Sequence, residues 1–220
     1  MHVPLRVDFA GGWLDVPAYA DRVGRIVNMA IQPLVTLKDL EAGRCAGLGG
    51  SAALAILHGL PAVEIELASG AGWQDPAVIK ETGLCVWQSG DWPSLRAKYP
   101  TEWLEGKLAL LWCGPHAQPT AETCTKPKSW GSILAAGNMA SLACELQSLF
   151  RLCQAVNLSY TAQQREGMRA LPEGREGARK YCGSGFGGNA LYVFAHQADR
   201  DAFVANTPDT RAIEPYNATD

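Results

Sequence analysis

The 220-residue sequence predicts a fold of mixed α-helices and β-strands, and three features support this prediction. KLALLWCG at 107–114 is a run of apolar residues typical of a buried strand. Apolar residues in 138–156 recur at steps of three and four, which predicts one amphipathic helix. Glycine-rich loops at 47–51 and 183–188 lie between such elements, and the sequence contains no internal repeat.

The other elements are predicted from local signals. Strands are expected at these positions: 5–10, 24–37 with an interruption at Pro33, 84–88, 190–194 and 211–216. Helices are expected at these positions: from Ser51 as N-cap to residue 60, 61–69, from a capping box of Thr161 and Gln164 onward, and 199–206. GWQDP at 72–76 is expected to be a stiff turn, because Gly72 and Pro76 both interrupt helices.

Composition and charge limit the classes of function. Hydrophobic residues make up 47% of the chain and charged residues 19%, as in ordinary globular proteins. The net charge is −3 and the pI is about 5.8, so nucleic acid is not an expected partner. The N-terminus lacks a signal-peptide pattern and no apolar stretch could span a bilayer, so no membrane partner is expected. Seven cysteines without a CxxC pair predict reduced thiols in a cytoplasmic protein.

The two glycine loops match dinucleotide-binding patterns only formally. The sequence GLGGSA at 47–52 fits GxGxxA, but no convincing buried strand precedes it. The sequence GSGFGG at 183–188 fits GxGxxG, but a strand follows where a helix is required. A Rossmann-type oxidoreductase is therefore disfavoured. The first loop instead places N–H groups at a helix start, where they suit a phosphate. A tight turn capped by Ser51 is the alternative.

Four segments in order resemble the motifs of a known superfamily. PLRVDFAGGWLDVP at 4–17, GLGGSAAL at 47–54 and KYCGSGFGGNALYVF at 180–194 resemble the three signature motifs of the GHMP kinases. This superfamily includes galactokinase, homoserine kinase, mevalonate kinase and phosphomevalonate kinase. GWQDP at 72–76 resembles the GWQDQ segment of its branch that contains L-fucose kinase and the heptose-phosphate kinases.

The resemblance implies a role for each matching residue. Asp75 matches the aspartate that faces the hydroxyl to be phosphorylated, and Arg6 is expected beside it as a second catalytic residue. The loop expected to hold the phosphates of ATP comprises Gly47, Leu48, Gly49, Gly50, Ser51 and Ala52. Ser51 and Glu64 are expected to hold Mg²⁺. The residues expected to contact the acceptor are Gly12, Asp15, Trp73, Gly183, Ser184, Gly185 and Gly187, and Trp13 could also stack on a sugar ring.

The resemblance also implies the fold and its division. It implies an α+β, two-domain GHMP kinase fold in a compact variant. Residues 1–128 would form a shortened N-terminal domain similar to domain 2 of ribosomal protein S5, and residues 129–220 a ferredoxin-like C-terminal domain. Only about ten residues separate Leu37 from Gly47, where family members usually carry further elements of the nucleotide-base pocket.

Two functions follow from these observations. The first is a kinase that uses ATP and Mg²⁺ to phosphorylate a hydroxyl of a sugar or sugar phosphate, such as fucose or a heptose. The second is a catalytically reduced module that binds a sugar phosphate or a protein partner without turnover. The short base-pocket segment favours the second function. Retention of both Ser51 and Asp75 favours the first, since a binding module has little need of both. The sequence predicts no oligomeric state.

Overall fold

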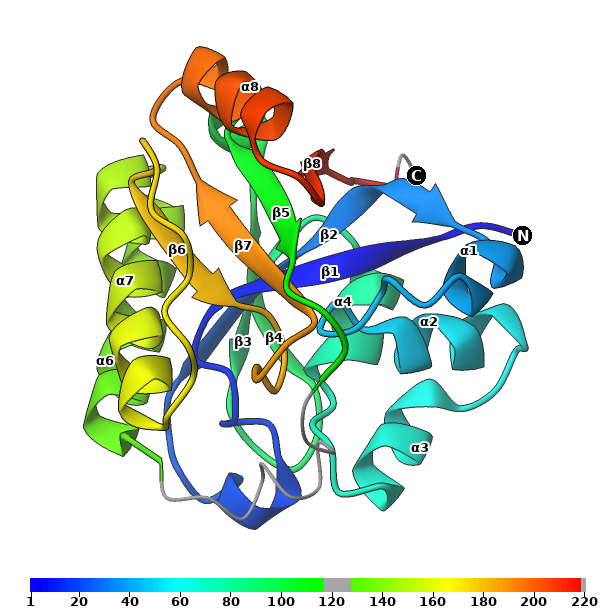
Figure 1. Cartoon of the computed structure of the whole chain (residues 1–220). Helices are drawn as coiled ribbons and strands as arrows, with labels where there is room; N and C mark the ends of the chain where they lie inside the picture. The colour runs from blue at the N-terminus through cyan, green and yellow to red at the C-terminus, as the bar shows by residue number, and fades with distance from the viewer. Residues whose placement is uncertain (117–127, 219–220) are drawn as a thin grey trace.

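A computed structural model describes residues 1–116 and 128–218 of the chain, in which helices flank an eight-stranded sheet (Figure 1). The strands are β1 (Val3–Ala10), β2 (Arg25–Val35), β3 (Leu84–Gln88), β4 (Ser94–Tyr99), β5 (Leu108–Trp112), β6 (Ala178–Tyr181), β7 (Asn189–Val193) and β8 (Thr210–Pro215). The helices are α1 (Leu37–Glu41), α2 (Gly50–Leu57), α3 (Ala62–Ala68), α4 (Gln74–Glu81), α6 (Trp130–Glu145), α7 (Leu149–Arg165) and α8 (Gln197–Asn206).

The strand pairing places β1 deep in the protein. The order along the sheet is β4-β3-β2-β8-β5-β7-β6, and β1 pairs with β2 outside this path. Every described strand pair is antiparallel. All eight residues of β1 are buried, including the charged Arg6 and Asp8. Buried charges are retained only when they are paired, so the fold must supply partners for both side chains.

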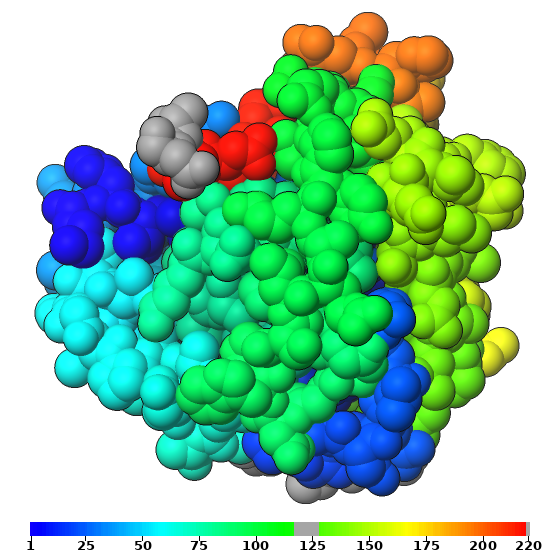
Figure 2. Space-filling model, turned by 180° about the vertical axis from the view of Figure 1, so that it is seen from behind, coloured from blue at the N-terminus to red at the C-terminus, as the bar shows by residue number. Residues whose placement is uncertain are grey.

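Apart from α8, which lies at the top of the view, the helices form two groups on either side of β1 (Figure 1). The antiparallel pair α6 and α7 lies at the left of the view, and α1 to α4 lie at the right. The largest hydrophobic core joins Val7 and Phe9 of β1 to Ala140 of α6 and Leu152 of α7. On the opposite face, the green residues of β3, β4 and their neighbours lie between the cyan and yellow-green helical regions (Figure 2).

Most of the elements expected from the sequence are confirmed. Within the segment 24–37, residues Arg25–Val35 form one strand, β2, which continues through Pro33. The single helix expected at 138–156 is wrong, because the chain turns at Gln147 (φ 47°) and the Ser148 hydroxyl caps a new helix, α7. The expected capping box at Thr161 is also wrong. Thr161 lies inside α7, where its hydroxyl donates to the Asn157 carbonyl at 2.9 Å.

The predicted division at residues 128 and 129 remains a prediction. It adjoins residues 117–127, which lie outside the described part of the chain. Strand β5 precedes this point and pairs with β7 and β8, which follow it. The two predicted halves therefore share one sheet.

Two further expectations concern cysteines and membranes. The six cysteines within the described residues are free thiols, and Cys124 lies outside those residues. The cytoplasmic location inferred from the cysteines remains a prediction. In the described ranges, no helix combines the length and apolarity that crossing a bilayer requires.

Helix α6 packs so closely on β2 that one position tolerates only glycine. A Cβ added at Gly137 would lie 2.1 Å from the backbone oxygen of Arg25. We expect Gly137→Ala to lower the free energy of unfolding by about 1–3 kcal/mol, despite the better helix propensity of alanine. Urea denaturation measures this change.

Gly131 is the matched control, because it lies in the same helix and a Cβ there would meet nothing within 4 Å. Gly131→Ala should be neutral or stabilise by up to about 1 kcal/mol. Equal effects of the two substitutions would contradict the close approach at Gly137.

Candidate active site

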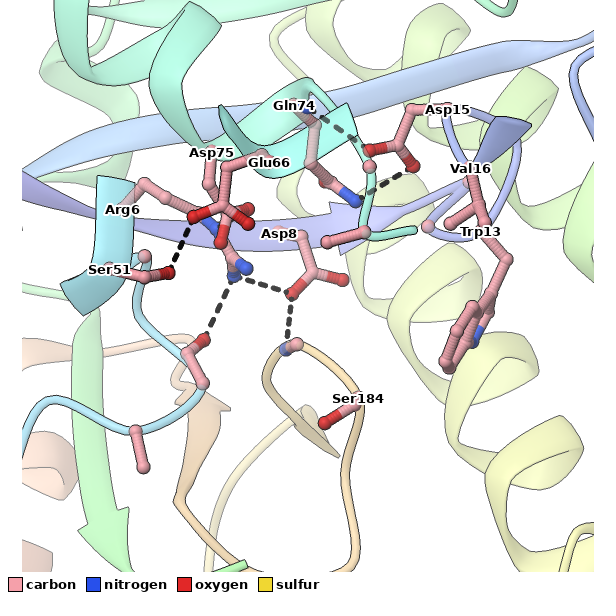
Figure 3. Close-up of a pocket in the computed structure, with 18 of the residues that line it drawn as sticks. Arg6, Asp8, Trp13, Asp15, Val16, Ser51, Glu66, Gln74, Asp75 and Ser184 are labelled. Carbon is pink, nitrogen blue, oxygen red and sulfur yellow. Dashed lines mark hydrogen bonds and ion pairs between the residues drawn. The ribbon is translucent and has the colours of Figure 1, made fainter. Parts of the chain in front are cut away.

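A cavity of about 460 Å³ opens between the two helix groups (Figure 3). Its walls come from β1 and the loop after it, the first glycine loop, α3, the start of α4, the end of α7 and the loop after β6. Each motif expected from the sequence therefore contributes to one hollow. The cavity is large enough for a small-molecule site.

The first glycine loop runs directly into α2. Gly49 is the N-cap of this helix with φ 79°, a left-handed conformation that favours glycine. A Cβ at Gly49 would also lie 3.3 Å from the Cβ of Asp75, so a larger residue would push the loop away from that carboxylate. The first N–H groups of a helix have no acceptor within the helix, so this helix start is suited to an anion.

Ser51 does not cap α2 as the sequence predicted. It lies within the first turn of the helix, and its hydroxyl donates to Oε1 of Glu66 at 2.5 Å. Glu66 lines the cavity from α3, and burial raises its pKa while the Ser51 hydrogen bond opposes that shift. Ser51 and Glu66 thus form an adjacent pair of oxygen ligands beside the glycine loop (Figure 3).

Glu64 is not brought to the cavity. Its side chain is exposed on α3, whereas Glu66 is 8% exposed. Two residues along a helix are separated by about 200°, so the two carboxylates face in different directions. The signal that could have identified Glu66 is its spacing from the buried Ala62 and Val63, at steps of four and three.

GWQDP is not an irregular turn, because α4 begins inside it at Gln74. Asp75 is the second residue of this helix and Pro76 the third. Proline is tolerated there because the first N–H groups of a helix need no acceptor. The helix start therefore fixes Asp75 at the cavity wall, with 19% of its side chain exposed.

Arg6 connects Asp75 to the glycine loop and to Asp8. Its Nε donates to Asp75 Oδ1 at 2.6 Å, and its Nη1 donates to Asp8 Oδ1 at 3.1 Å and to the Gly47 carbonyl at 2.9 Å. Burial acts to lower the pKa of Arg6, but the charges of Asp75 and Asp8 outweigh burial and raise it. Arg6 therefore stays a guanidinium cation within the fold.

Asp8 also anchors the second glycine loop. Its carboxylate accepts from the Gly183 N–H at 3.1 Å and pairs with the buried Lys180. Lys180 Nζ also donates to the Asp8 carbonyl at 3.0 Å. Asn189 holds the two loops together, because its Nδ2 donates to the Ala46 carbonyl at 2.9 Å. Neither Lys180 nor Asp8 was expected in the site from the sequence.

Asp15 forms a second polar centre with Gln74. The Gln74 backbone N–H donates to Asp15 Oδ2 at 3.0 Å, and Gln74 Nε2 donates to Oδ1 at 3.1 Å (Figure 3). Burial raises the pKa of Asp15 to about 7, although the hydrogen bond from the Gln74 backbone opposes the shift. Asp15 therefore changes charge near neutral pH.

The remaining expected residues divide into two groups. Gly12, Gly183 and Ser184 line the cavity, and their contact with an acceptor remains a prediction. The expected residues that do not line it are Leu48, Ala52, Trp73, Gly185 and Gly187. Trp73 is fully buried beside Trp87, and its Nε1 donates to the Gly90 carbonyl at 2.7 Å. Cavity residues that the sequence did not indicate include Gln163 and Glu166 of the α7 end.

The raised pKa of Asp15 has a consequence for stability. Unfolded Asp15 ionises near pH 4, and the folded residue near pH 7. Between these values the folded protein keeps a proton that the unfolded chain has lost, so its free energy of unfolding falls as pH rises and levels off above pH 7. Asp15→Asn removes this dependence. Between pH 4.5 and pH 8, we expect the free energy of unfolding of this variant to rise relative to that of wild type by on the order of 3 kcal/mol. Urea denaturation at the two pH values measures the change.

Asp91→Asn serves as the control, because Asp91 is exposed and outside the cavity. Its stability relative to wild type should change little over the same range. A constant difference between Asp15→Asn and wild type at both pH values would contradict the burial of a protonated Asp15.

Comparison with known proteins gives structural matches only. No protein-family model matches the sequence, and no curated protein matches it. The structure is similar to that of a D-glycero-D-manno-heptose 1-phosphate kinase from Bacteroides thetaiotaomicron, with a TM-score of 0.64 and 15% sequence identity. The match covers 100% of this chain and 99% of the kinase chain. It is also similar to Streptococcus pneumoniae phosphomevalonate kinase in complex with phosphomevalonate and AMPPNP, with a TM-score of 0.69 and 12% sequence identity. That match covers 98% of this chain and 99% of the phosphomevalonate kinase chain.

A third similar structure is Lactococcus lactis galactokinase complexed with galactose, with a TM-score of 0.64 and 11% sequence identity. The match covers 97% of this chain and 92% of the galactokinase chain. At these identities the matches establish the fold over almost the whole of each chain. The α+β prediction is confirmed, and the chain has the fold of the GHMP kinases.

Proposed function

We propose that the protein is a small-molecule kinase that transfers the γ-phosphate of ATP to a hydroxyl group of a sugar-like acceptor. The observation that carries this proposal is the ion pair of the buried Arg6 with Asp75, which lies at one cavity wall beside the glycine loop that starts α2. Phosphoryl transfer needs alignment of the two substrates and neutralisation of charge more than covalent help. A binding module has little need of such a pair, so the kinase is favoured over a module without turnover.

The first turn of α2 is the proposed phosphate site. The N–H groups there belong to Gly50, Ser51 and Ala52, and helix starts of this kind bind phosphates. A hollow of about 250 Å³ between α1 and α2 shares Gly50 and Ser51 with the cavity. We place the nucleotide base there, against Leu40 and Leu54. The short segment after Leu37 thus still forms one wall of a base site through α1.

Ser51 and Glu66 are the residues proposed to hold Mg²⁺, in place of Ser51 and Glu64. Both supply hard oxygen ligands and lie in contact with each other. The described residues contain no cluster of three or more potential metal-ligating side chains. This agrees with a Mg²⁺ ion bound by few protein ligands and completed by phosphate oxygens. A bound Mg²⁺ would neutralise charge on the transferring phosphate.

Asp75 is the proposed group that receives the acceptor. Arg6 holds Oδ1 of its carboxylate, and the rest of the side chain faces the cavity. In the proposed step the acceptor hydroxyl donates a hydrogen bond to Asp75, and its oxygen attacks the γ-phosphorus. The new P–O bond forms as the bond to ADP breaks, and the hydroxyl proton passes to Asp75 and then to water.

Substitution of Asp75 tests this role. In Asp75→Asn the amide oxygen can still accept from Arg6, but the side chain can no longer take a proton. We expect kcat to fall by about 10²- to 10⁴-fold while the affinity for Mg·ATP changes little. ADP release with a panel of sugars measures kcat, and calorimetry measures ATP affinity.

The exposed Asp91→Asn is the matched control and should retain wild-type turnover. Wild-type protein that binds Mg·ATP but phosphorylates no sugar would count against the kinase. Full activity of Asp75→Asn would show that Asp75 takes no part in the reaction, but it would not contradict the kinase function.

A further inference from the structure

One end of the cavity contains two locally unfavourable features that the proposed reaction does not explain. Trp13 has φ 81°, a left-handed conformation in which a bulky side chain is strained. Glu166 is the C-cap of α7, where the helix dipole disfavours a negative charge. Both residues line the cavity, and Trp13 lies on the side away from Ser51 (Figure 3). Strain of this kind persists where the surroundings fix it, and it concentrates at functional sites.

Lys128 joins these two residues. Its Nζ is 2.9 Å from Glu166 Oε2 and 3.8 Å from the centre of the Trp13 ring. The Lys128 side chain is fully buried and that of Glu166 is 5% exposed. The Lys128 ammonium group therefore holds the Glu166 carboxylate and the Trp13 ring in place, and it is not available to bind a ligand.

The charges of the described cavity residues disfavour one class of acceptor. Among the described lining residues, the guanidinium and ammonium groups are those of Arg6 and Lys180. Both are bound to carboxylates, Arg6 to Asp75 and Asp8, and Lys180 to Asp8. Five carboxyl groups line the same cavity: Asp8, Asp15, Glu66, Asp75 and Glu166. A second phosphate, on the acceptor, would face Glu166, and above pH 7 also an ionised Asp15, without an unengaged cation from the described residues.

Hydroxyl groups suit the same surface well. Ionised carboxylates only accept hydrogen bonds, so they recognise donors such as sugar hydroxyls. The Trp13 ring offers an apolar face against which the C–H face of a sugar ring can pack. We propose that Trp13, Lys128 and Glu166 form an acceptor subsite that selects an uncharged, hydroxyl-rich ring and disfavours its phosphorylated form. This inference rests on the proposed kinase function for its place in the reaction.

Direct binding tests the subsite independently of turnover. Calorimetry compares D-mannose with D-mannose 6-phosphate, D-galactose with D-galactose 6-phosphate, and L-fucose with L-fucose 1-phosphate. At least one free sugar should bind, and its phosphate should bind at least about tenfold more weakly. No binding by any free sugar, or equal or tighter binding of its phosphate, would overturn the proposal.

Two variants test the named residues. Glu166→Gln should reduce the discrimination between sugar and sugar phosphate at least about threefold, with ATP affinity unchanged. Glu145→Gln, on the exposed part of α6, should leave the discrimination as in wild type. Should Glu166→Gln fail to fold, Trp13→Gly decides, because glycine adopts φ 81° without strain and the substitution removes the whole Trp13 side chain. Unchanged sugar affinity in Trp13→Gly, or unchanged discrimination in folded Glu166→Gln, would contradict the subsite.

Adding Mg·ATP separates this inference from the proposed function. Preferential binding of a free sugar that is never phosphorylated would support the subsite and contradict the kinase. Efficient phosphorylation of a sugar phosphate, with poor use of the free sugar, would support the kinase and overturn the subsite.

Discussion

The buried guanidinium of Arg6 is the interaction on which the candidate site depends. A charge in a fully buried strand is tolerated only when its donors are satisfied, and Arg6 binds Asp75, Asp8 and the Gly47 carbonyl. These partners come from α4, β1 and the first glycine loop. The cost of burying Arg6 therefore forces three separate segments into one arrangement. Removing either carboxylate would leave the buried Arg6 with one charged partner instead of two.

Asp8 extends this arrangement to the second glycine loop. Through Gly183 and Lys180 it ties the end of β6 to the centre of β1, and Asn189 ties the same loop to the first one. The strands that border the cavity, β1 and β6, belong to the same sheet as β2, β5 and β8. This shared sheet fixes the cavity walls relative to one another. Preorganisation of this kind suits phosphoryl transfer, in which position and charge supply most of the rate enhancement.

Much of this arrangement could be predicted from the sequence, because the segments that form it resemble the motifs of the GHMP kinases in residue type and order. The glycine loops, Arg6, Asp15 and Asp75 were all expected in one site; Arg6, Asp15 and Asp75 line the cavity, and each loop contributes part of its residues. Glu64 was not brought there, since the choice between Glu64 and Glu66 depends on which face of α3 is buried.

Other features depend on tertiary contacts that local patterns do not encode. The division of 138–156 into two helices follows from a turn at Gln147, although its apolar periodicity continues across the break. Trp73 was expected to contact the acceptor because it belongs to the GWQDP segment, but the ring packs against Trp87 in the core. Lys128 and Glu166 are far apart in the sequence and belong to none of the motifs, so their pairing could be found only in the fold.

The most direct measurement is a calorimetric titration of ATP into the wild-type protein with and without Mg²⁺, repeated with Glu66→Gln and Glu64→Gln. A phosphate loop at α2 with a Ser51–Glu66 metal site predicts saturable, Mg²⁺-dependent binding that Glu66→Gln weakens and Glu64→Gln leaves unchanged. Failure of the wild-type protein to bind Mg·ATP would contradict a phosphoryl-transfer site in this cavity.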